Sequence, residues 1–273
     1  MGWLAPGKRA EMRLALVTGG ASGLGRAVAT RLLDDGWAVE LWDRDAPGLD
    51  AALAGREGVS RRIVDVRSAD EVRGGFEALA EPPAVVFHAA GVCHVGDLET
   101  LRLDECRLDM DVNYFGTVHL LQAAAPRLRP GSHVICVASV AGLKGLPEFA
   151  GYGATKFAVL GFCEAVEGEL RRRGITLSVL CPPAVATPMV RNLAYHPALY
   201  SLFPFSDEKA VVETVMRGLR SGRFLLMVDA GTRALRLVDR VAPRLLARYL
   251  DWRVQRHRRA HPGWKNELPP PLR

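Results

Sequence analysis

Short apolar runs alternate with longer segments of helical period along most of the chain. The apolar runs, each a predicted strand, are Leu14 to Val17, Ala38 to Trp42, Arg62 to Val64, Ala84 to Phe87, His133 to Ala138, Thr176 to Leu180 and Phe224 to Val228. Helices are predicted between them at 22–35, 68–80, 104–128, 151–172 and 206–221. Strands that are apolar throughout are buried on both faces, so this order predicts an α/β fold with a doubly wound parallel sheet. Its ligand site is expected at the carboxyl ends of the strands.

Length and composition favour one large domain. The chain has 273 residues, of which 49% are hydrophobic, enough for a substantial core. It has no apolar run of about 18 residues, and residues 1–12 lack the features of a signal peptide, so we expect a cytoplasmic protein. The five cysteines lack the intervals of zinc sites or redox pairs, and a metal at His88, Cys93 and His94 lacks a completing pair, so no metal is expected.

The net charge of +6 is concentrated at the end of the chain. Residues 231–273 contain eleven Lys and Arg but three acidic residues, a balance of +8 that leaves −2 for the rest. We therefore divide the chain into a nearly neutral body, 12–230, and a basic C-terminal extension, 231–273.

The first predicted strand ends in TGGASGLG, residues 18–25, and a helix follows directly. Gly19, Gly23 and Gly25 allow a tight turn and the close approach of a pyrophosphate, which the N–H groups of the helix amino terminus would bind together with Ser22 and Leu24. Such turns also arise for packing alone, so the motif needs support from other residues.

Two acidic residues follow the next strands. Asp43 lies eighteen residues beyond Gly25, where a carboxylate accepts hydrogen bonds from a ribose and repels a 2′-phosphate, which favours NAD over NADP. The adjacent Arg44 leaves NADP open, because a guanidinium can pair with that phosphate. Asp65 is placed to bind the adenine edge, although helix capping by Asp65 or Ser68 is an alternative.

Tyr152 and Lys156 lie four residues apart in a predicted helix and therefore share one face. Tyrosine has an ordinary pKa of about 10, so its use as a base near neutral pH requires a shift of around 3 pKa units. A neighbouring ammonium and the charge of a bound nicotinamide would both lower this pKa. Ser139, at the end of a strand, is placed to hold a substrate oxygen beside the phenol.

Together these motifs resemble the short-chain dehydrogenases/reductases in their single-domain form, over about residues 12–230. The resemblance rests on TGGASGLG, Asp65-Val66, HAAG at 88–91, Asn113, Ser139 and YGATK at 152–156. It implies a Rossmann fold and NAD(P)-dependent hydride transfer at an alcohol or ketone. It implies further roles for these residues: catalysis by Asn113, Ser139, Tyr152 and Lys156, with Asn113 holding a water for proton relay, and cofactor binding by Val66, Ala89, Ala90, Gly91, Tyr152, Lys156, Pro182, Val185 and Thr187.

The family also implies a homodimer or homotetramer through the helices at 104–128 and 151–172. The chain departs from the family pattern at His88, where an asparagine is usual, and at Pro183, where a glycine is usual. Pro183 removes an N–H and narrows the loop beside the nicotinamide. A non-catalytic cofactor-binding or scaffold protein is an alternative, but the serine, tyrosine and lysine are all present.

Substrate specificity is expected from two apolar segments. Residues 184–205, which include Ala184 and Met189, would cover the nicotinamide site, and Leu143 and Phe149 would add to the same wall. We therefore predict a lipid-like, steroid-like or bulky aromatic or terpenoid alcohol or ketone as the small-molecule partner. Alternatively, these side chains pack a lid or a subunit contact, and the substrate is a small polar carbonyl.

The extension from 231 onward reads as an amphipathic basic helix, kinked or restarted near Pro243. Arginines recur at 236, 240, 244 and 248, and an apolar stripe comprises Val238, Val241, Leu245, Tyr249 and Trp252. This helix packs on its own body or a neighbouring subunit, or else binds an anionic membrane surface peripherally. Nucleic acid is not an expected partner.

Overall fold

The computed structural model describes residues 13–193, 197–202 and 205–261. The predictions made for residues 1–12 and for the tail 262–273 fall outside the described residues. The same holds for two parts of the predicted cover of the site, 194–196 and 203–204.

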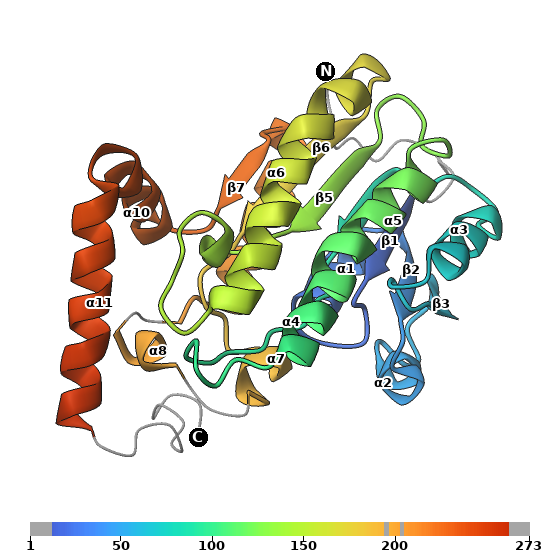
Figure 1. The fold of residues 1–273 in the computed structure, drawn as a ribbon. Coiled ribbons are helices and arrows are strands. Elements are labelled where there is room, and N and C mark those ends of the chain that lie inside the picture. The colour runs from blue at the N-terminus through green and yellow to red at the C-terminus, as the bar shows by residue number, and fades with distance from the viewer. Residues whose placement is uncertain (1–12, 194–196, 203–204, 262–273) are drawn as a thin grey trace.

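All seven predicted strands form one parallel sheet (Figure 1). Their bounds are Leu14–Thr18 (β1), Ala38–Asp43 (β2), Val59–Ile63 (β3), Val85–His88 (β4), His133–Val137 (β5), Thr176–Cys181 (β6) and Leu225–Met227 (β7). The spatial order is β3-β2-β1-β4-β5-β6-β7, so the winding reverses between β1 and β4 and opens a crevice at the carboxyl ends there. The predicted α/β fold with a doubly wound parallel sheet is confirmed.

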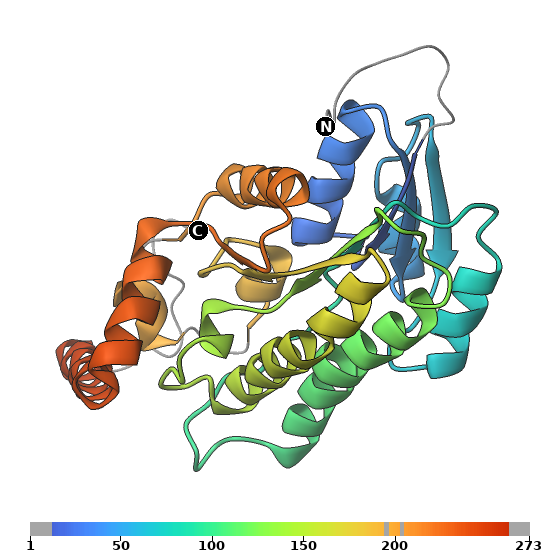
Figure 2. The same ribbon diagram turned by 90° about the horizontal axis from the view of Figure 1, so that it is seen from above.

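Helices cover both faces of this sheet (Figure 2). One face carries α1 (Gly23–Asp34) and α9 (Glu208–Ser221), which pack against each other. The opposite face carries α3 (Ala69–Glu77), α5 (Gly116–Ala124) and α6 (Ala150–Arg172). Each face has its own buried apolar core, which explains why the central strands are largely apolar. The edge strand β3 is half-exposed and mostly polar, and it begins at Val59, so the strand predicted at 62–64 overlaps only its end.

The helix predicted at 104–128 is an unbroken helical run over 103–124, but it is not α-helical throughout. It consists of α4 (Leu103–Asp109), one π-helical segment at Met110–Phe115 and then α5. Four short elements were not predicted, because a single turn is too short for periodicity to show: α2 (Ala46–Ala51), α7 (Pro188–Arg191), α8 (Ala198–Leu202) and a 3₁₀ turn at Val140–Gly142.

The C-terminal extension forms two helices, α10 (Ala230–Val241) and α11 (Pro243–Ala260), with the expected restart at Pro243. Proline lacks an N–H and is therefore tolerated in the first turn of a helix. Leu250 and Val254 of α11 are buried against Phe149 and α8, so one face of α11 packs on the body of the protein. Within the described part of the chain, none of the helices combines the length and apolarity needed to cross a bilayer.

His88 connects the two central strands through a side chain. Its Nδ1 lies 2.7 Å from the hydroxyl of Thr18 on β1. The Thr18 hydroxyl also accepts from the Ala90 N–H at 3.2 Å. Burial, followed by the charge of Lys156, lowers the pKa of His88 to about 3.

This depressed pKa predicts an acid-sensitive fold. An unfolded histidine has a pKa of about 6.5, so between that pH and about pH 3 only the unfolded chain binds this proton. The free energy of unfolding should therefore fall with pH, by about 1.4 kcal/mol per unit for this group. Denaturant titrations at pH 7 and 5 should show a fall about 2 kcal/mol smaller in His88→Asn than in the wild type. An equal fall in both proteins would contradict the assignment.

Candidate active site

The turn between β1 and α1 is built for close backbone approach. Gly19 has a φ of +67°, and a Cβ on it would lie 2.8 Å from the backbone of Ala89. A Cβ on Gly25 would lie 2.1 Å from the carbonyl oxygen of Gly19. Neither position accommodates a side chain, so the turn leaves the amino terminus of α1 uncovered, the arrangement that suits a pyrophosphate.

A cavity of about 1200 Å³ extends from this turn along the carboxyl ends of the strands. Small-molecule sites usually measure roughly 300–1,000 Å³, so this cavity has room for a dinucleotide together with a substrate. The residues predicted to bind cofactor all line it: Gly19, Ser22, Gly23, Leu24, Gly25, Asp43, Arg44, Asp65, Val66, Ala89, Ala90, Gly91, Tyr152, Lys156, Pro182, Val185 and Thr187. The side chains present therefore fit NAD(P).

The two acidic residues at the glycine-turn end differ in their partners. The carboxylate of Asp43 accepts from the N–H of Ala21 at 3.0 Å and of Asp45 at 3.1 Å, which fixes it beside the glycine turn. The carboxylate of Asp65 is paired with Arg67, whose hydrogen bond lowers the pKa of Asp65. Ser68, rather than Asp65, caps α3 by accepting from the Glu71 N–H at 3.2 Å.

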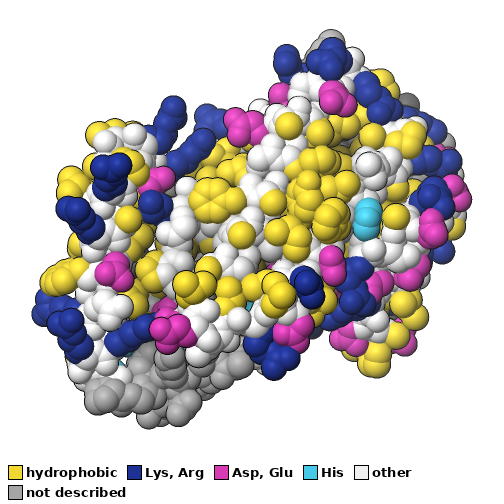
Figure 3. All heavy atoms as spheres, viewed as in Figure 1, with side chains coloured by type: hydrophobic (Ala, Val, Ile, Leu, Met, Phe, Trp, Pro, Cys, Tyr) yellow, Lys and Arg dark blue, Asp and Glu magenta, His cyan; other side chains and the backbone are white. Residues whose placement is uncertain are grey.

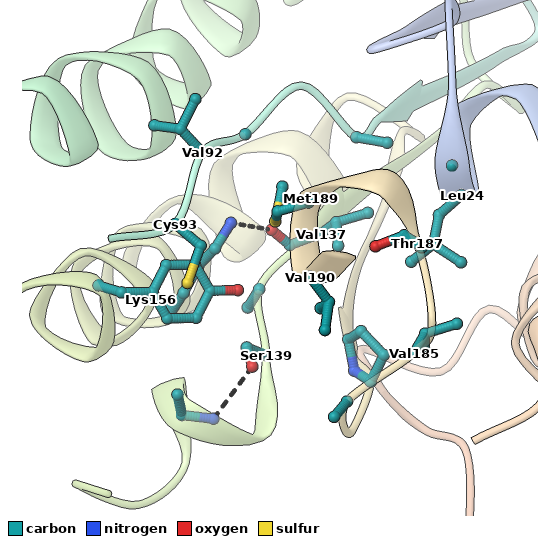
Figure 4. A pocket seen from close by; sticks show the side chains of 18 of the residues that line it. Leu24, Val92, Cys93, Val137, Ser139, Lys156, Val185, Thr187, Met189 and Val190 are labelled. Carbon is teal, nitrogen blue, oxygen red and sulfur yellow. Dashed lines mark hydrogen bonds between the residues drawn. The ribbon is translucent and has the colours of Figure 1, made fainter. Parts of the chain in front are cut away.

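The other end of the cavity brings Ser139, Tyr152 and Lys156 together. Ser139 follows β5 and caps the 3₁₀ turn, accepting from the Ala141 N–H at 3.1 Å (Figure 4). Tyr152 lies in the first turn of α6 and lines the cavity together with Ser139. Lys156 follows one turn later, with its Nζ 5.5 Å from the centre of the Tyr152 ring.

Lys156 is held away from solvent. Its side chain is buried, and its ammonium donates to the carbonyl oxygen of Val137 at 3.0 Å (Figure 4). Burial lowers the pKa of Lys156 to about 8. Because this pKa lies close to neutral pH, a charge placed beside Lys156 readily changes its protonation.

The expected pKa shift of Tyr152 is absent in the protein alone. Burial raises the pKa of this phenol above its ordinary value, while the hydrogen bond with Ser139 acts in the opposite direction. Lys156 and a bound nicotinamide were together expected to lower this pKa, and in the protein alone the Lys156 ammonium donates to the carbonyl oxygen of Val137. The pKa of the phenol therefore stays raised without the cofactor, and the expected fall depends on the charge that the nicotinamide adds beside Lys156.

Asn113 lies behind the cavity rather than in its wall. It belongs to the π-helical segment, and its amide donates to the carbonyl of Val92 and to the hydroxyl of Thr155, both at 2.9 Å. Its Oδ1 accepts from the N–H of Val92. Both amide donors are thus used within the protein, so the predicted water would have to bind a carbonyl oxygen.

Most of the residues that were predicted to contact the substrate line the cavity. Ala184, Phe149 and Met189 line the cavity, and Figure 4 shows Met189 and Val190 of α7 facing Ser139 and Lys156. Leu143 does not line it and packs instead in the core between the sheet and α6. Leu143 follows the 3₁₀ turn, which packs against α6, whereas Val140 and Ala141 of the turn itself line the cavity.

Aromatic side chains from segments distant in sequence enclose Tyr152. The ring of Phe149 lies 6.3 Å from Tyr152 and 5.4 Å from Tyr200 of α8. Tyr200 in turn lies 5.2 Å from Phe205. These rings form an apolar wall at the reaction end of the cavity.

Sequence reasoning missed a clasp that fixes this wall. The buried carboxylate of Glu148 accepts from Arg258 of α11 at 2.5 Å and from the N–H of Ala198 at 2.7 Å. Arg258 also donates to Asp97 at 2.5 Å. No local pattern could reveal a contact that joins positions 110 residues apart.

A second missed pair lies beside the same wall. His94 lines the cavity, and its Nδ1 lies 2.6 Å from the buried carboxylate of Asp109. The sequence analysis considered His94 only as part of a metal site, which it rejected for lack of a completing pair. In the part of the chain described by the structure, no group of three or more His, Cys, Asp or Glu side chains is arranged to hold a metal ion.

Residues 13–197 match the short chain dehydrogenase family. The chain therefore belongs to the short-chain dehydrogenases/reductases, NAD(P)-dependent oxidoreductases that act on alcohol and ketone groups. The resemblance drawn from the motifs is confirmed.

Three similar proteins illustrate the range of the family. Estradiol 17-beta-dehydrogenase 11 of Mus musculus is 25% identical over 266 residues, covering 93% of this chain and 88% of the relative. The 1-deoxy-11-beta-hydroxypentalenate dehydrogenase of Streptomyces avermitilis is 34% identical over 230 residues, covering 79% and 84%. A short chain dehydrogenase from Burkholderia cenocepacia, solved in complex with NADP, has a TM-score of 0.78 and 25% identity, covering 88% of this chain and 98% of that one.

The approach of Ser139 to Tyr152 depends on Gly142. A Cβ at Gly142 would lie 2.6 Å from the carbonyl oxygen of Lys156, whereas one at Gly145 would meet nothing within 4 Å. Gly142→Ala should therefore lower the free energy of unfolding by about 1–3 kcal/mol and reduce turnover, because α6 has to move away from the 3₁₀ turn. Gly145→Ala, the matched control, should stay within about 0.5 kcal/mol of the wild type. Similar effects of both substitutions in thermal melts and rate assays would refute this dependence.

Proposed function

We propose that this protein transfers a hydride between NAD and an apolar secondary alcohol or ketone, with Tyr152 transferring the proton. The observation that carries this proposal is the position of Ser139, Tyr152 and Lys156 in the same cavity as the glycine turn. The family membership supports the reaction class, and the identity of these three side chains supports catalysis over a scaffold role.

Each catalytic residue acts on the substrate oxygen, on the Tyr152 phenol or on the nicotinamide ribose. Bound NAD(P) supplies the hydride donor or acceptor at the substrate carbon. Ser139 holds the substrate oxygen, and Tyr152 gives its phenolic proton to this oxygen in reduction or removes the proton in oxidation. Lys156 holds the nicotinamide ribose and supplies positive charge near the phenol. Asn113 keeps the loop at Val92 in place, and proton relay through a water at this residue remains part of the proposal.

Cofactor preference is proposed from the glycine-turn end. The carboxylate of Asp43 is fixed by two N–H groups beside the ribose position, where its charge disfavours a 2′-phosphate. Arg44 lines the same part of the cavity, and NADP is the alternative if this guanidinium turns inward. NAD is thus the proposed cofactor.

An apolar substrate is proposed from the composition of the wall. Leu146, Phe149, Met189 and Leu199 line the cavity around Tyr152 and Tyr200. Burial of a hydrocarbon body against such a wall contributes about 25 cal/mol per Å². The mouse estradiol dehydrogenase and the Streptomyces hydroxypentalenate dehydrogenase, by their names, act on apolar ring compounds, which supports the same substrate class.

The protein is proposed to be cytoplasmic, with a peripheral position at a membrane. It is also proposed to form a homodimer or homotetramer through the faces of α5 and α6. Figure 3 shows hydrophobic side chains gathered over these two helices. Phe115, at the end of the π-helical segment just before α5, and Phe157 of α6 are each 45% exposed there, which fits a contact between subunits.

The reaction and the substrate class are tested in one experiment. Nicotinamide absorbance should report turnover of hydroxy-steroids or long-chain secondary alcohols, with little turnover of small polar alcohols. Tyr152→Phe should lower kcat by about 10²–10⁴-fold, because it removes the proton donor.

Tyr114→Phe is the matched control for that experiment. Tyr114 packs against Phe162 and does not line the cavity, so its substitution should leave kcat unchanged. Undiminished turnover in Tyr152→Phe would refute the mechanism, and a preference for small polar compounds would refute the substrate class. No turnover of any compound would favour a non-catalytic cofactor-binding role.

The negative charge of Asp43 should set the preference for NAD over NADP. Asp43→Asn keeps an acceptor for the Ala21 N–H but removes the charge, so kcat/KM with NADP should rise relative to NAD by about tenfold, or roughly 1.4 kcal/mol. Asp45→Asn removes an equal charge at a residue that does not line the cavity and should leave the ratio unchanged. If the wild type prefers NADP and Arg44→Ser loses this preference, Arg44 binds the 2′-phosphate and the proposed NAD preference is wrong.

Substitutions in the proposed subunit contact should lower the mass of the oligomer. The wild type should be a dimer or tetramer by light scattering, and Phe115→Asp with Phe157→Asp should dissociate it by burying like charges in the contact. Leu98→Asp, at a loop position that is 85% exposed, should leave the mass unchanged. A wild-type monomer would contradict the proposal.

A further inference from the structure

The outer faces of α10 and α11 expose apolar side chains that the body of the protein does not cover. Leu237 and Val241 of α10 are 64% and 79% exposed, and Leu245 of α11 is 66% exposed. Tyr249 and Trp252 continue the stripe on α11 at 45% and 52% exposure. This stripe, Leu237 to Trp252, lies on the part of the molecule farthest from β3 (Figure 1).

The stripe is separate from the packing of these helices on the body. The inward face of α11 is formed by Leu250 and Val254, each 1% exposed. Leu245, Tyr249 and Trp252 are spaced by four and three residues and therefore form one line on a different side of the helix. Packing on the body, one of the alternatives that the sequence offered, accounts for the inward face of α11. The outward face has no partner among the described residues.

The charges around the stripe are almost all positive. Arg240, Arg244, Arg248 and Arg256 are exposed beside it, and Figure 3 shows basic and hydrophobic side chains together along this edge. On α10 and α11, the acidic residues are Asp239, which pairs with Lys144, and Asp251. The guanidiniums of Arg253 and Arg256 stack on Tyr249 and Trp252 at 5.6 and 5.4 Å, so charge and aromatic surface are presented together.

These properties select one occupant for the stripe. A second copy of the same surface would place arginines against arginines, which is unfavourable. A single convex helix face of apolar, aromatic and basic side chains suits a flat anionic surface, where Trp and Tyr lie at the headgroup level and Arg meets lipid phosphates. We infer that α10 and α11 dock this protein on an anionic phospholipid bilayer through the Leu237 to Trp252 stripe.

The docking helices also form part of the cavity wall. Thr232 and Leu235 of α10 line the cavity, while Val254 of α11 packs with Phe149 and Leu199, which line its reaction end. Docking therefore places the substrate end of the cavity near the bilayer. Docking itself does not depend on the proposed reaction, but its use for taking a substrate from the bilayer rests on the proposed apolar substrate.

Vesicle flotation with the full chain tests the docking, without substrate or cofactor. The wild type should float with phosphatidylcholine vesicles that contain phosphatidylglycerol, and neither with pure phosphatidylcholine vesicles nor at high salt. Leu245→Ser with Trp252→Ser, and separately Arg240→Gln with Arg244→Gln and Arg248→Gln, should each lower the partition coefficient by about tenfold or more.

Matched controls separate the stripe from general surface properties. Ile63→Ser with Leu98→Ser removes comparable exposed apolar surface elsewhere, and Arg127→Gln with Arg129→Gln and Arg171→Gln removes equal charge; both should float like the wild type. The stripe variants should keep the wild-type melting temperature, because the substituted side chains are exposed.

Two results would overturn the inference. The first is failure of the wild type to float with anionic vesicles at low salt. The second is a change of oligomeric mass in Leu245→Ser with Trp252→Ser while flotation is unchanged, which would show that another copy of the chain covers the stripe. Either result would leave the proposed oxidoreductase reaction intact, because that reaction is measured separately by nicotinamide absorbance.

Discussion

The burial of Lys156 beside Tyr152 is the constraint on which the rest of the site depends. An ammonium removed from water is stable only with good partners, and Lys156 has the carbonyl oxygen of Val137 at 3.0 Å. The same burial lowers the pKa of Lys156 to about 8 and raises that of Tyr152. Two groups that resist charging are thus held side by side, so an added charge in the cavity can change the protonation of either one.

Several features of the fold can be understood as supports for this pair. Gly142 lets the 3₁₀ turn contact α6, so that Ser139 reaches the phenol. Thr155, between Tyr152 and Lys156, accepts a hydrogen bond from Asn113 and so ties the start of α6 to the π-helical segment. The Glu148 clasp attaches α8 and α11 to the chain just before α6. These contacts join the reaction end to the body of the protein, while residues of α7 and α8 line the cavity around it.

The sequence allowed the sheet and the main motifs to be predicted, because their signals are local. Strands buried on both faces are visible as apolar runs, the glycine turn needs φ values and clearances that glycine meets best, and Tyr152 and Lys156 are one helical turn apart. The division of residues along the cavity followed from the rule that parallel strands place ligands at their carboxyl ends.

What was missed depends on contacts between distant residues. The direction of the Tyr152 pKa shift depends on enclosure by Phe149 and Tyr200, which no spacing reveals. Leu143 was misplaced because the short 3₁₀ turn before it, which no spacing reveals, packs against α6. Which face of α11 packs inward could not be determined from its pattern alone, since Leu250 and Val254 are as apolar as the exposed Leu245.

We propose that cofactor charge, added to the buried Lys156, makes Tyr152 available for proton transfer. Ultraviolet difference titration of tyrosinate in the wild type, with Tyr152→Phe subtracted, measures the pKa of Tyr152 directly. We expect a pKa above the ordinary value of about 10 in the protein alone and a fall of at least about 2 units when oxidised NAD is bound. A pKa that stays unchanged when NAD binds would contradict it.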